Sequence, residues 1–264
     1  MAIKYSIDEL SSFALEVIQN TGKEALAFYQ KSPSKVKFNE TLVTEAELHL
    51  NSHFQKTLRD TYPDHKTFQD RQLEEEYSHD EKRYLWIFDP IDGVDNFQAG
   101  IPIWGMSLAL LENFWPVLGI FYMPVTDDLF HAQAGKKAYW GKQQIGVTSQ
   151  QSVDDESLLL TFSRFHQYYD SGFPGKIRDL GSIGAHVCYV AMGRADAAVT
   201  ANESYKDLAA VRVIIEAAGG KIGKVGGGDF YLNDYLDGRK ITDHLVVASP
   251  DNHSQVLQHL TKRS

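Results

Sequence analysis

The chain has 264 residues, a length that predicts one large domain or two small ones. Its 26 basic and 35 acidic residues give a net charge of −9, and this acidic balance argues against nucleic acid or an anionic membrane as a partner. A hydrophobic fraction of 43% excludes a disordered chain. The single cysteine, Cys188, excludes an internal disulfide and is typical of a reducing compartment, so we expect a cytoplasmic protein.

Hydrophobic patterning in the first half of the chain predicts two helices and then a sheet. Apolar residues at three- and four-residue steps favour helices over residues 6–30 and from Thr44 to the break at residues 62–64. No run reaches the roughly 18 apolar residues that a membrane span needs. A compact apolar run at residues 84–88 predicts a buried strand. Further strands are predicted at residues 36–38, 103–111, 117–123, 129–132 and 138–140.

The second half alternates strands with helices, which predicts mixed α/β layers. Strands are expected at residues 158–161, 197–200 and 245–248, and helices at residues 182–192, 207–218 and 251–262. Residues 141–152 are the expected hinge between the halves. We therefore expect an N-terminal α+β half over residues 1–145 and a C-terminal α/β half over residues 146–264 that completes the site.

The most informative segment follows the predicted strand at residues 84–88. Asp89, Asp92 and Asp95 fall within seven residues, and carboxylates so close repel one another unless cations neutralise them. Pro90 and Gly93 predict a sharp turn, after which free backbone amides at a helix start can bind phosphate oxygens. Oxygen ligands beside an anion-binding turn suit Mg²⁺-assisted phosphate chemistry. By spacing alone, a surface turn whose aspartates cap a helix is an equal alternative.

The sequence WIFDPIDGVDNF at residues 86–97 resembles the W-I-x-D-P-I/L-D-G-T-x-N-F signature of the inositol monophosphatase family, within the lithium-sensitive, Mg²⁺-dependent phosphatases. Residues 42–44, 178–196 and 207–220 resemble the family's other motifs, and in the family's order. The resemblance covers nearly the whole chain. It implies a layered α-β-α-β-α sandwich of the sugar phosphatase type and a homodimer. It also implies a Mg²⁺-dependent phosphomonoesterase acting on a small polyol or sugar phosphate, by default inositol monophosphate.

The resemblance further implies a role for each matching residue. Asp89 would bridge two Mg²⁺ ions, the carbonyl of Ile91 would bind the first ion, and Asp92 with Asp207 would bind the second. By the same resemblance we expect two or three Mg²⁺ ions in all and inhibition by Li⁺. The implied substrate-binding positions are the amides of Gly93 and Val94, together with Asp95, Gly181, Ser182 and Glu203.

The loop before residues 84–88 departs from the family pattern. The family has Gly-Glu-Glu there, and its first Glu binds the first metal ion. Residues 68–71 of this chain read Phe-Gln-Asp-Arg at the aligned position, so we favour Asp70 as a catalytic metal ligand, one methylene shorter. The alternative is a ligand from Glu74–Glu76, although these residues lie only 13 to 15 positions before Asp89, which is short for the family.

Two substitutions within the matched motifs affect the expected chemistry. Val94 replaces a threonine whose hydroxyl orients the attacking water in the family, and such general-base support contributes about 10²–10⁴-fold in rate. We therefore expect a slow enzyme, or one that holds its water differently. Lys206 replaces the tryptophan before Asp207, where it could pair with the carboxylates in the absence of metal or extend outward. Thr200 stands where inositol-preferring members carry a glutamate, and Glu203 could reach a similar place.

Two alternatives to the inositol phosphatase reading stay open. The first is a phosphatase of the same fold that acts on fructose-1,6-bisphosphate, histidinol phosphate or an adenosine bisphosphate, although Asn96-Phe97 favours the inositol branch. The second is a weak or inactive homologue that binds phosphate or a partner, since Val94 and Asp70-Arg71 weaken the part of the site that activates water.

Overall fold

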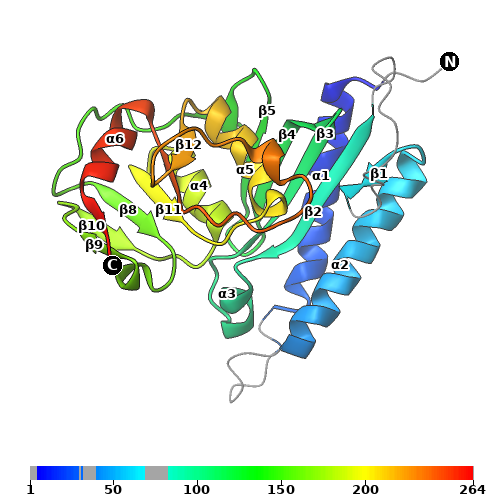
Figure 1. Ribbon diagram of the computed structural model, residues 1–264. Coiled ribbons are helices and arrows are strands. Elements are labelled where there is room, and N and C mark those ends of the chain that lie inside the picture. The colour runs from blue at the N-terminus through cyan, green and yellow to red at the C-terminus, as the bar shows by residue number, and fades with distance from the viewer. Residues whose placement is uncertain (1–4, 30, 32–39, 69–82, 264) are drawn as a thin grey trace.

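The computed structural model describes residues 5–29, 31, 40–68 and 83–263. Figure 1 shows five layers in the order helix, sheet, helix, sheet, helix. The helices α1 (Ile7–Leu26) and α2 (Glu40–Thr61) cover one face of a seven-stranded sheet, and α4 (Ile183–Ala191) and α5 (Tyr205–Ala217) lie between this sheet and a five-stranded one. Helix α6 (Pro250–Gln258) covers the outer face of the second sheet. The predicted α-β-α-β-α sandwich is confirmed.

The seven-stranded sheet follows the order of the chain. Its strands are β1 (Lys66–Thr67), β2 (Tyr84–Asp92), β3 (Gly105–Glu112), β4 (Trp115–Met123), β5 (Asp128–Gln133), β6 (Ala138–Trp140) and β7 (Gln143–Ile145). Only β1 and β2 pair in parallel among these described strands. Strand β2 is apolar on both faces because helices cover both sides of the sheet. Trp86 and Phe88 face the core under α1 and α2, whereas Leu85 and Ile87 face α4 and α5.

The five-stranded sheet has the order β10-β8-β11-β13-β12. Its strands are β8 (Leu158–Thr161), β10 (Lys176–Arg178), β11 (Ala197–Thr200), β12 (Lys221–Lys224) and β13 (Leu245–Ala248). The smaller elements are the helix α3 (Val94–Ala99), the 3-10 turns η2 (Phe165–Gln167) and η3 (Leu232–Tyr235), and the paired strands β9 (Tyr169–Ser171) and β14 (Leu260–Lys262). The core between the two sheets contains residues from both sides of residue 145, such as Ile87 and Ile214.

Helix α5 packs unusually close to the first sheet, which matters for the site that it carries. A side chain at Gly119 of β4 would lie 2.0 Å from the backbone oxygen of Ala210, so only glycine fits opposite the helix. The small residues Ala209 and Ala210 are fully buried at this contact. The close packing holds the start of α5 beside the end of β2.

Several predicted element boundaries are wrong by a few residues. The predicted last helix ends at Gln258, because residues 260–262 pair with β9 as strand β14. Helix α2 begins at Glu40 rather than Thr44, and helix α1 ends at Leu26 rather than residue 30. The predicted strand at residues 36–38 lies outside the described residues. Within the described part of the chain, no helix is both long and apolar enough to cross a membrane.

Candidate active site

The predicted turn lies at the end of β2, where the strand bulges. Asp89 pairs with Ser107 of β3 and Asp92 pairs with Gly105, so two residues of β2 lie opposite one of β3. Pro90 contributes to this bulge because it has no amide proton for the ladder. Gly93 then adopts a left-handed φ of 89°, and helix α3 begins at the next residue.

The carboxylate of Asp89 is buried and pairs with a lysine. Asp89 is 6% exposed, and the Nζ atom of Lys206 lies 2.7 Å from its Oδ1 atom. Lys206 comes from the first turn of α5, so residues 117 positions apart form this ion pair. Burial raises the pKa of Asp89, and the neighbouring Lys206 ammonium acts in the opposite direction. Of the two expectations for Lys206, pairing with the carboxylates or extending outward, the structure shows the first.

The carboxylate of Asp92 lies over the start of α4. It accepts hydrogen bonds from the hydroxyl of Ser182 at 2.6 Å and from the amides of Gly184 and Ile183 at 2.7 and 3.3 Å. Ser182 is itself the N-cap of α4, because its Oγ accepts from the amide of Ala185. Burial raises the pKa of Asp92 to about 7, even though these hydrogen bonds favour the charged form.

Asp207 is the third residue of α5 and closes a capping box with Ser204. Its Oδ2 atom accepts from the amide and the hydroxyl of Ser204, at 2.7 and 2.8 Å. The predicted start of this helix at Asp207 is therefore wrong by two residues, since α5 begins at Tyr205. Nearby, burial together with the charges of Asp207 and Asp92 raises the pKa of Glu203 to about 8.

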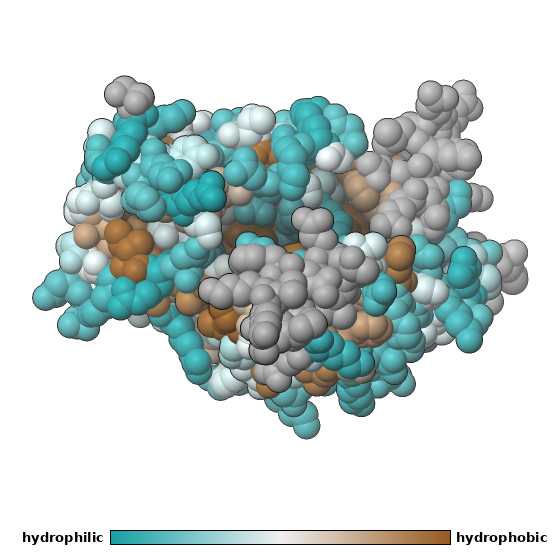
Figure 2. Space-filling view, turned by 90° about the horizontal axis from the view of Figure 1, so that it is seen from below, coloured by the Kyte–Doolittle hydropathy of each residue, from teal (hydrophilic) through white to brown (hydrophobic). Residues whose placement is uncertain are grey.

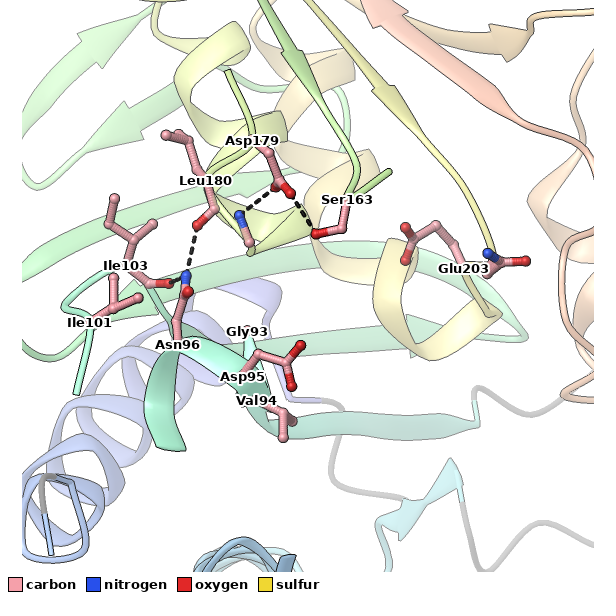
Figure 3. A pocket seen from close by; sticks show the side chains of 12 residues that line it. Gly93, Val94, Asp95, Asn96, Ile101, Ile103, Ser163, Asp179, Leu180 and Glu203 are labelled. Atoms are coloured by element: carbon pink, nitrogen blue, oxygen red, sulfur yellow. Dashed lines mark hydrogen bonds between the residues drawn. The ribbon is translucent and has the colours of Figure 1, made fainter. Parts of the chain in front are cut away.

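A cavity of about 750 Å³ opens beside the turn. Seen from the side on which α3 lies, the molecule is hollowed near its centre, and much of the rim is hydrophilic (Figure 2). The cavity is lined by Gly93, Val94, Asp95, Asn96, Ile101, Ile103, Ser163, Asp179, Leu180, Gly181, Asn202 and Glu203. Figure 3 shows Asp95 and Val94 on one side of it and Glu203, from the segment after β11, on another.

Two hydrogen-bonded contacts hold the wall of this cavity together. The side-chain amide of Asn96 donates to the carbonyl oxygens of Ile103 and Leu180, at 2.5 and 2.7 Å, which joins α3 to the segment before α4 (Figure 3). The carboxylate of Asp179 accepts from the hydroxyl of Ser163 at 2.5 Å and from the amide of Gly181 at 2.8 Å. The wall is therefore fixed before any ligand arrives.

The predicted site residues fall into four groups. Gly93, Val94, Asp95, Gly181 and Glu203 line the cavity. Asp89, Asp92 and Asp207 lie beside it, close enough for the charge of Asp207 to raise the pKa values of Asp89 and Asp92. Ser182 contacts Asp92 instead of lining the cavity. Asp70 and Glu74–Glu76 lie outside the described residues.

Sequence reasoning missed three polar residues of the cavity wall, Ser163, Asp179 and Asn202. Asp179 lies inside the matched stretch at residues 178–196, which was the available signal. Thr200, considered as a substitute for a substrate-binding glutamate, is buried in β11 and is not among the cavity residues.

The described residues fit a divalent cation in chemistry but not in their present orientation. Within residues 5–29, 31, 40–68 and 83–263, no three His, Cys, Asp or Glu side chains converge as a ready metal site. Asp92 and Asp207 face helix starts, and Asp89 faces Lys206. Yet four acidic side chains, those of Asp89, Asp92, Glu203 and Asp207, lie near one another here. The described ion pairs bring two lysines to them: Lys206 pairs with Asp89, and the Nζ atom of Lys240 lies 3.9 Å from Asp207. Hard oxygen donors with excess negative charge are what Mg²⁺ requires.

Comparisons with known proteins identify relatives of this chain. An inositol-1-monophosphatase of Caulobacter vibrioides is 31% identical over 198 residues, which cover 68% of this chain and 72% of that protein. A histidinol-phosphatase of Chlorobaculum parvum is 30% identical over 217 residues, 78% of this chain and 82% of that protein. The fold is similar to a solved inositol monophosphatase structure from Zymomonas mobilis, with a TM-score of 0.76 and 20% identity, covering 97% of this chain and 99% of that one. A model of the inositol monophosphatase family matches residues 6–264, and the chain therefore belongs to that family.

Proposed function

We propose that this protein is a Mg²⁺-dependent phosphomonoesterase that acts on a small polyol or sugar phosphate. The observation that carries the proposal is the buried acidic turn at the end of β2, which borders a polar cavity large enough for such a substrate. Family membership supports the reaction class, and relatives named for different substrates leave the substrate to be argued from the cavity.

The residues at the turn have distinct parts in this proposal. Asp89, Asp92, Asp207 and the carbonyl of Ile91 would hold Mg²⁺, which when bound lowers the pKa of a water so that hydroxide can attack phosphorus. The amides of Gly93 and Val94 would hold the phosphate oxygens at the edge of the cavity. Val94 has no hydroxyl to orient the attacking water, so we expect slow turnover.

The cavity wall favours a monophosphate over a bisphosphate. Its described lining includes the carboxylates of Asp95 and Asp179, together with Glu203, whose pKa of about 8 keeps it protonated at pH 7, and no lysine or arginine. A second phosphate would face these carboxylates without a basic partner, which argues against fructose-1,6-bisphosphate and adenosine bisphosphates. The hydroxyls of a polyol can instead donate hydrogen bonds to the same carboxylates.

The acidic wall also supports a second candidate substrate, histidinol phosphate. Its amino group is cationic at neutral pH and would be attracted by Asp95 and Asp179. The relative named histidinol-phosphatase is about as similar to this chain as the relative named inositol-1-monophosphatase. Both substrates therefore belong in the first assay.

The test is the release of inorganic phosphate from inositol 1-phosphate, histidinol phosphate, fructose-1,6-bisphosphate and an adenosine bisphosphate, each with Mg²⁺ or with EDTA. We expect Mg²⁺-dependent release from a monophosphate, at least about tenfold faster than from either bisphosphate. Turnover of none of the four would contradict the proposal. Binding of inorganic phosphate in that case, measured by calorimetry, would favour a non-catalytic homologue.

A further inference from the structure

The ion pair between Lys206 and Asp89 lies at the residue for which the family resemblance implies a bridging metal ligand. The ammonium is 2.7 Å from the Asp89 carboxylate, and the side chains are 39% and 9% exposed. Glu47 and Asp207 also attract this ammonium. The lysine therefore supplies positive charge to three carboxylates, one of them buried in the sheet.

The backbone positions of both partners are fixed by packing. Asp89 lies in the strand β2, paired with Ser107 of β3. Lys206 follows Tyr205, which is fully buried and stacks on Phe68 with ring centres 5.5 Å apart. The capping box of Ser204 and Asp207 holds the same turn of α5. The ammonium can reach Asp89 without any change in the fold.

The stem of Lys206 is also accommodated. It borders a small cavity of about 30 Å³ whose lining includes Phe54, Phe68 and Phe88. Aromatic side chains beside the stem, among polar ones such as Asn51 and Thr67, and a carboxylate at its tip hold the lysine by both packing and charge. The ammonium of Lys206 thus supplies Asp89 with a positive charge that would otherwise have to come from an ion in solution.

We propose that Lys206 is a built-in cation that takes the place of one divalent ion at Asp89, so that this protein binds one ion fewer than its acidic residues would otherwise hold. The inference rests on the proposed function for its premise that the site binds Mg²⁺. The physical reason is that a tethered ammonium at one oxygen of Asp89 repels a second divalent ion from this carboxylate and satisfies part of the charge that would attract it.

The experiment counts Mn²⁺ ions bound per chain, by calorimetry and by the electron paramagnetic resonance signal of free Mn²⁺, with no substrate present. The variants are Lys206→Gln, Lys206→Arg and a matched control, Lys224→Gln, which removes the partner of Asp243 at 3.0 Å on the second sheet. We expect Lys206→Gln to bind one additional ion, and Lys206→Arg and the control to bind as many ions as the wild type. Equal counts in the wild type and Lys206→Gln, zero included, would overturn the inference.

A second measurement uses the wild-type protein, so it decides the question even if Lys206→Gln does not fold. The rate at which an amine-acetylating reagent labels Lys206 is measured by peptide mass spectrometry with and without saturating Mg²⁺, with Lys224 as the internal reference. A resident ammonium gives the same rate in both conditions. A rate that rises with Mg²⁺ at Lys206 alone would mean that the metal displaces the lysine, and would overturn the inference.

Both readouts are independent of catalysis. If none of the four phosphate esters is hydrolysed but Lys206→Gln gains an ion, the proposed function fails and the inference about Lys206 stands. If an ester is hydrolysed and the ion counts are equal, the proposed function stands and the inference fails.

Discussion

The two aspartates at the end of β2 lie three residues apart, yet they are neutralised in opposite ways. Asp92 accepts hydrogen bonds from backbone amides at the start of α4, which any sequence forming that helix start would provide, and from the hydroxyl of Ser182. Asp89 depends on the side chain of one residue, Lys206. Backbone amide donors remain after most side-chain substitutions. An ion pair, by contrast, is lost when one of its two side chains is substituted, and a metal ion can then take the place of the lysine.

The largest effect should come from Asp89→Asn. The amide keeps the shape of the side chain but removes the charge that would attract both Mg²⁺ and Lys206, so we expect phosphatase activity to fall by at least about 10²-fold. Initial rates at saturating Mg²⁺ check this. Asp170→Asn, at a surface pair with Arg263, is the control and should keep full activity. A fall of less than about tenfold would mean that Asp89 does not hold the catalytic charge.

Removing the other partner tests how far Asp89 depends on a single side chain. Breaking a fully buried ion pair costs roughly 3–5 kcal/mol. Because Lys206 is 39% exposed, water screens part of this, and we expect Lys206→Gln to lose about 1–2 kcal/mol in EDTA. Urea unfolding measures the free energy, and Lys224→Gln should change it by less than about 0.5 kcal/mol. If Lys206→Gln lowers the free energy of unfolding no more than Lys224→Gln does, Asp89 does not depend on Lys206, and the contrast with Asp92 disappears.

The neutralisation of Asp92 is tested by comparing two helix caps. Ser182→Ala removes the N-cap of α4 together with the hydroxyl that donates to Asp92, whereas Ser249→Ala removes the N-cap of α6 alone. We expect the first variant to lose about 1 kcal/mol more in the free energy of unfolding, since hydrogen bonds to charged groups contribute more than neutral ones. Equal losses would show that the amides of α4 are sufficient for Asp92.

The smallest effect is a pH dependence that comes from Glu203, which faces the cavity with its pKa raised to about 8. The folded state then holds a proton at pH 7 that the unfolded state has released, so stability falls as pH rises through 8. Between pH 7.5 and 8.5, above the pKa of about 7 of Asp92 and where the buried histidines with pKa values lowered to about 4 stay neutral, the slope is a fraction of the roughly 1.4 kcal/mol per pH unit of one proton.

Urea unfolding in EDTA at several pH values measures this slope, and Glu203→Gln should make it flatter. If the wild type and Glu203→Gln have the same slope, Glu203 is ionised in the metal-free cavity. A nearby cation, as at Asp89, would then neutralise Glu203 in place of a bound proton.

Local patterns predicted much of the fold and part of the site. The apolar run before Asp89, the turn with Pro90 and Gly93, and the helix with Ser182 at its start are all in the structure, as is the family's layered sandwich. These features depend on residues within a few positions of one another, since helix and strand periodicities and turn chemistry are short-range. The boundary error at α6 arises where pairing of residues 260–262 with β9 competes with local preference.

The sequence by itself determined that acidic residues would gather after a buried strand and that the chain would belong to a phosphate-handling family. Only the tertiary structure decided what neutralises each carboxylate, which is Lys206 for Asp89 and the start of α4 for Asp92. It also decided that Asp179 and Ser163 would form the cavity wall. The physical reason is that charge pairing acts through space, between segments as much as 117 residues apart, and no periodicity along the chain encodes which distant side chain will arrive.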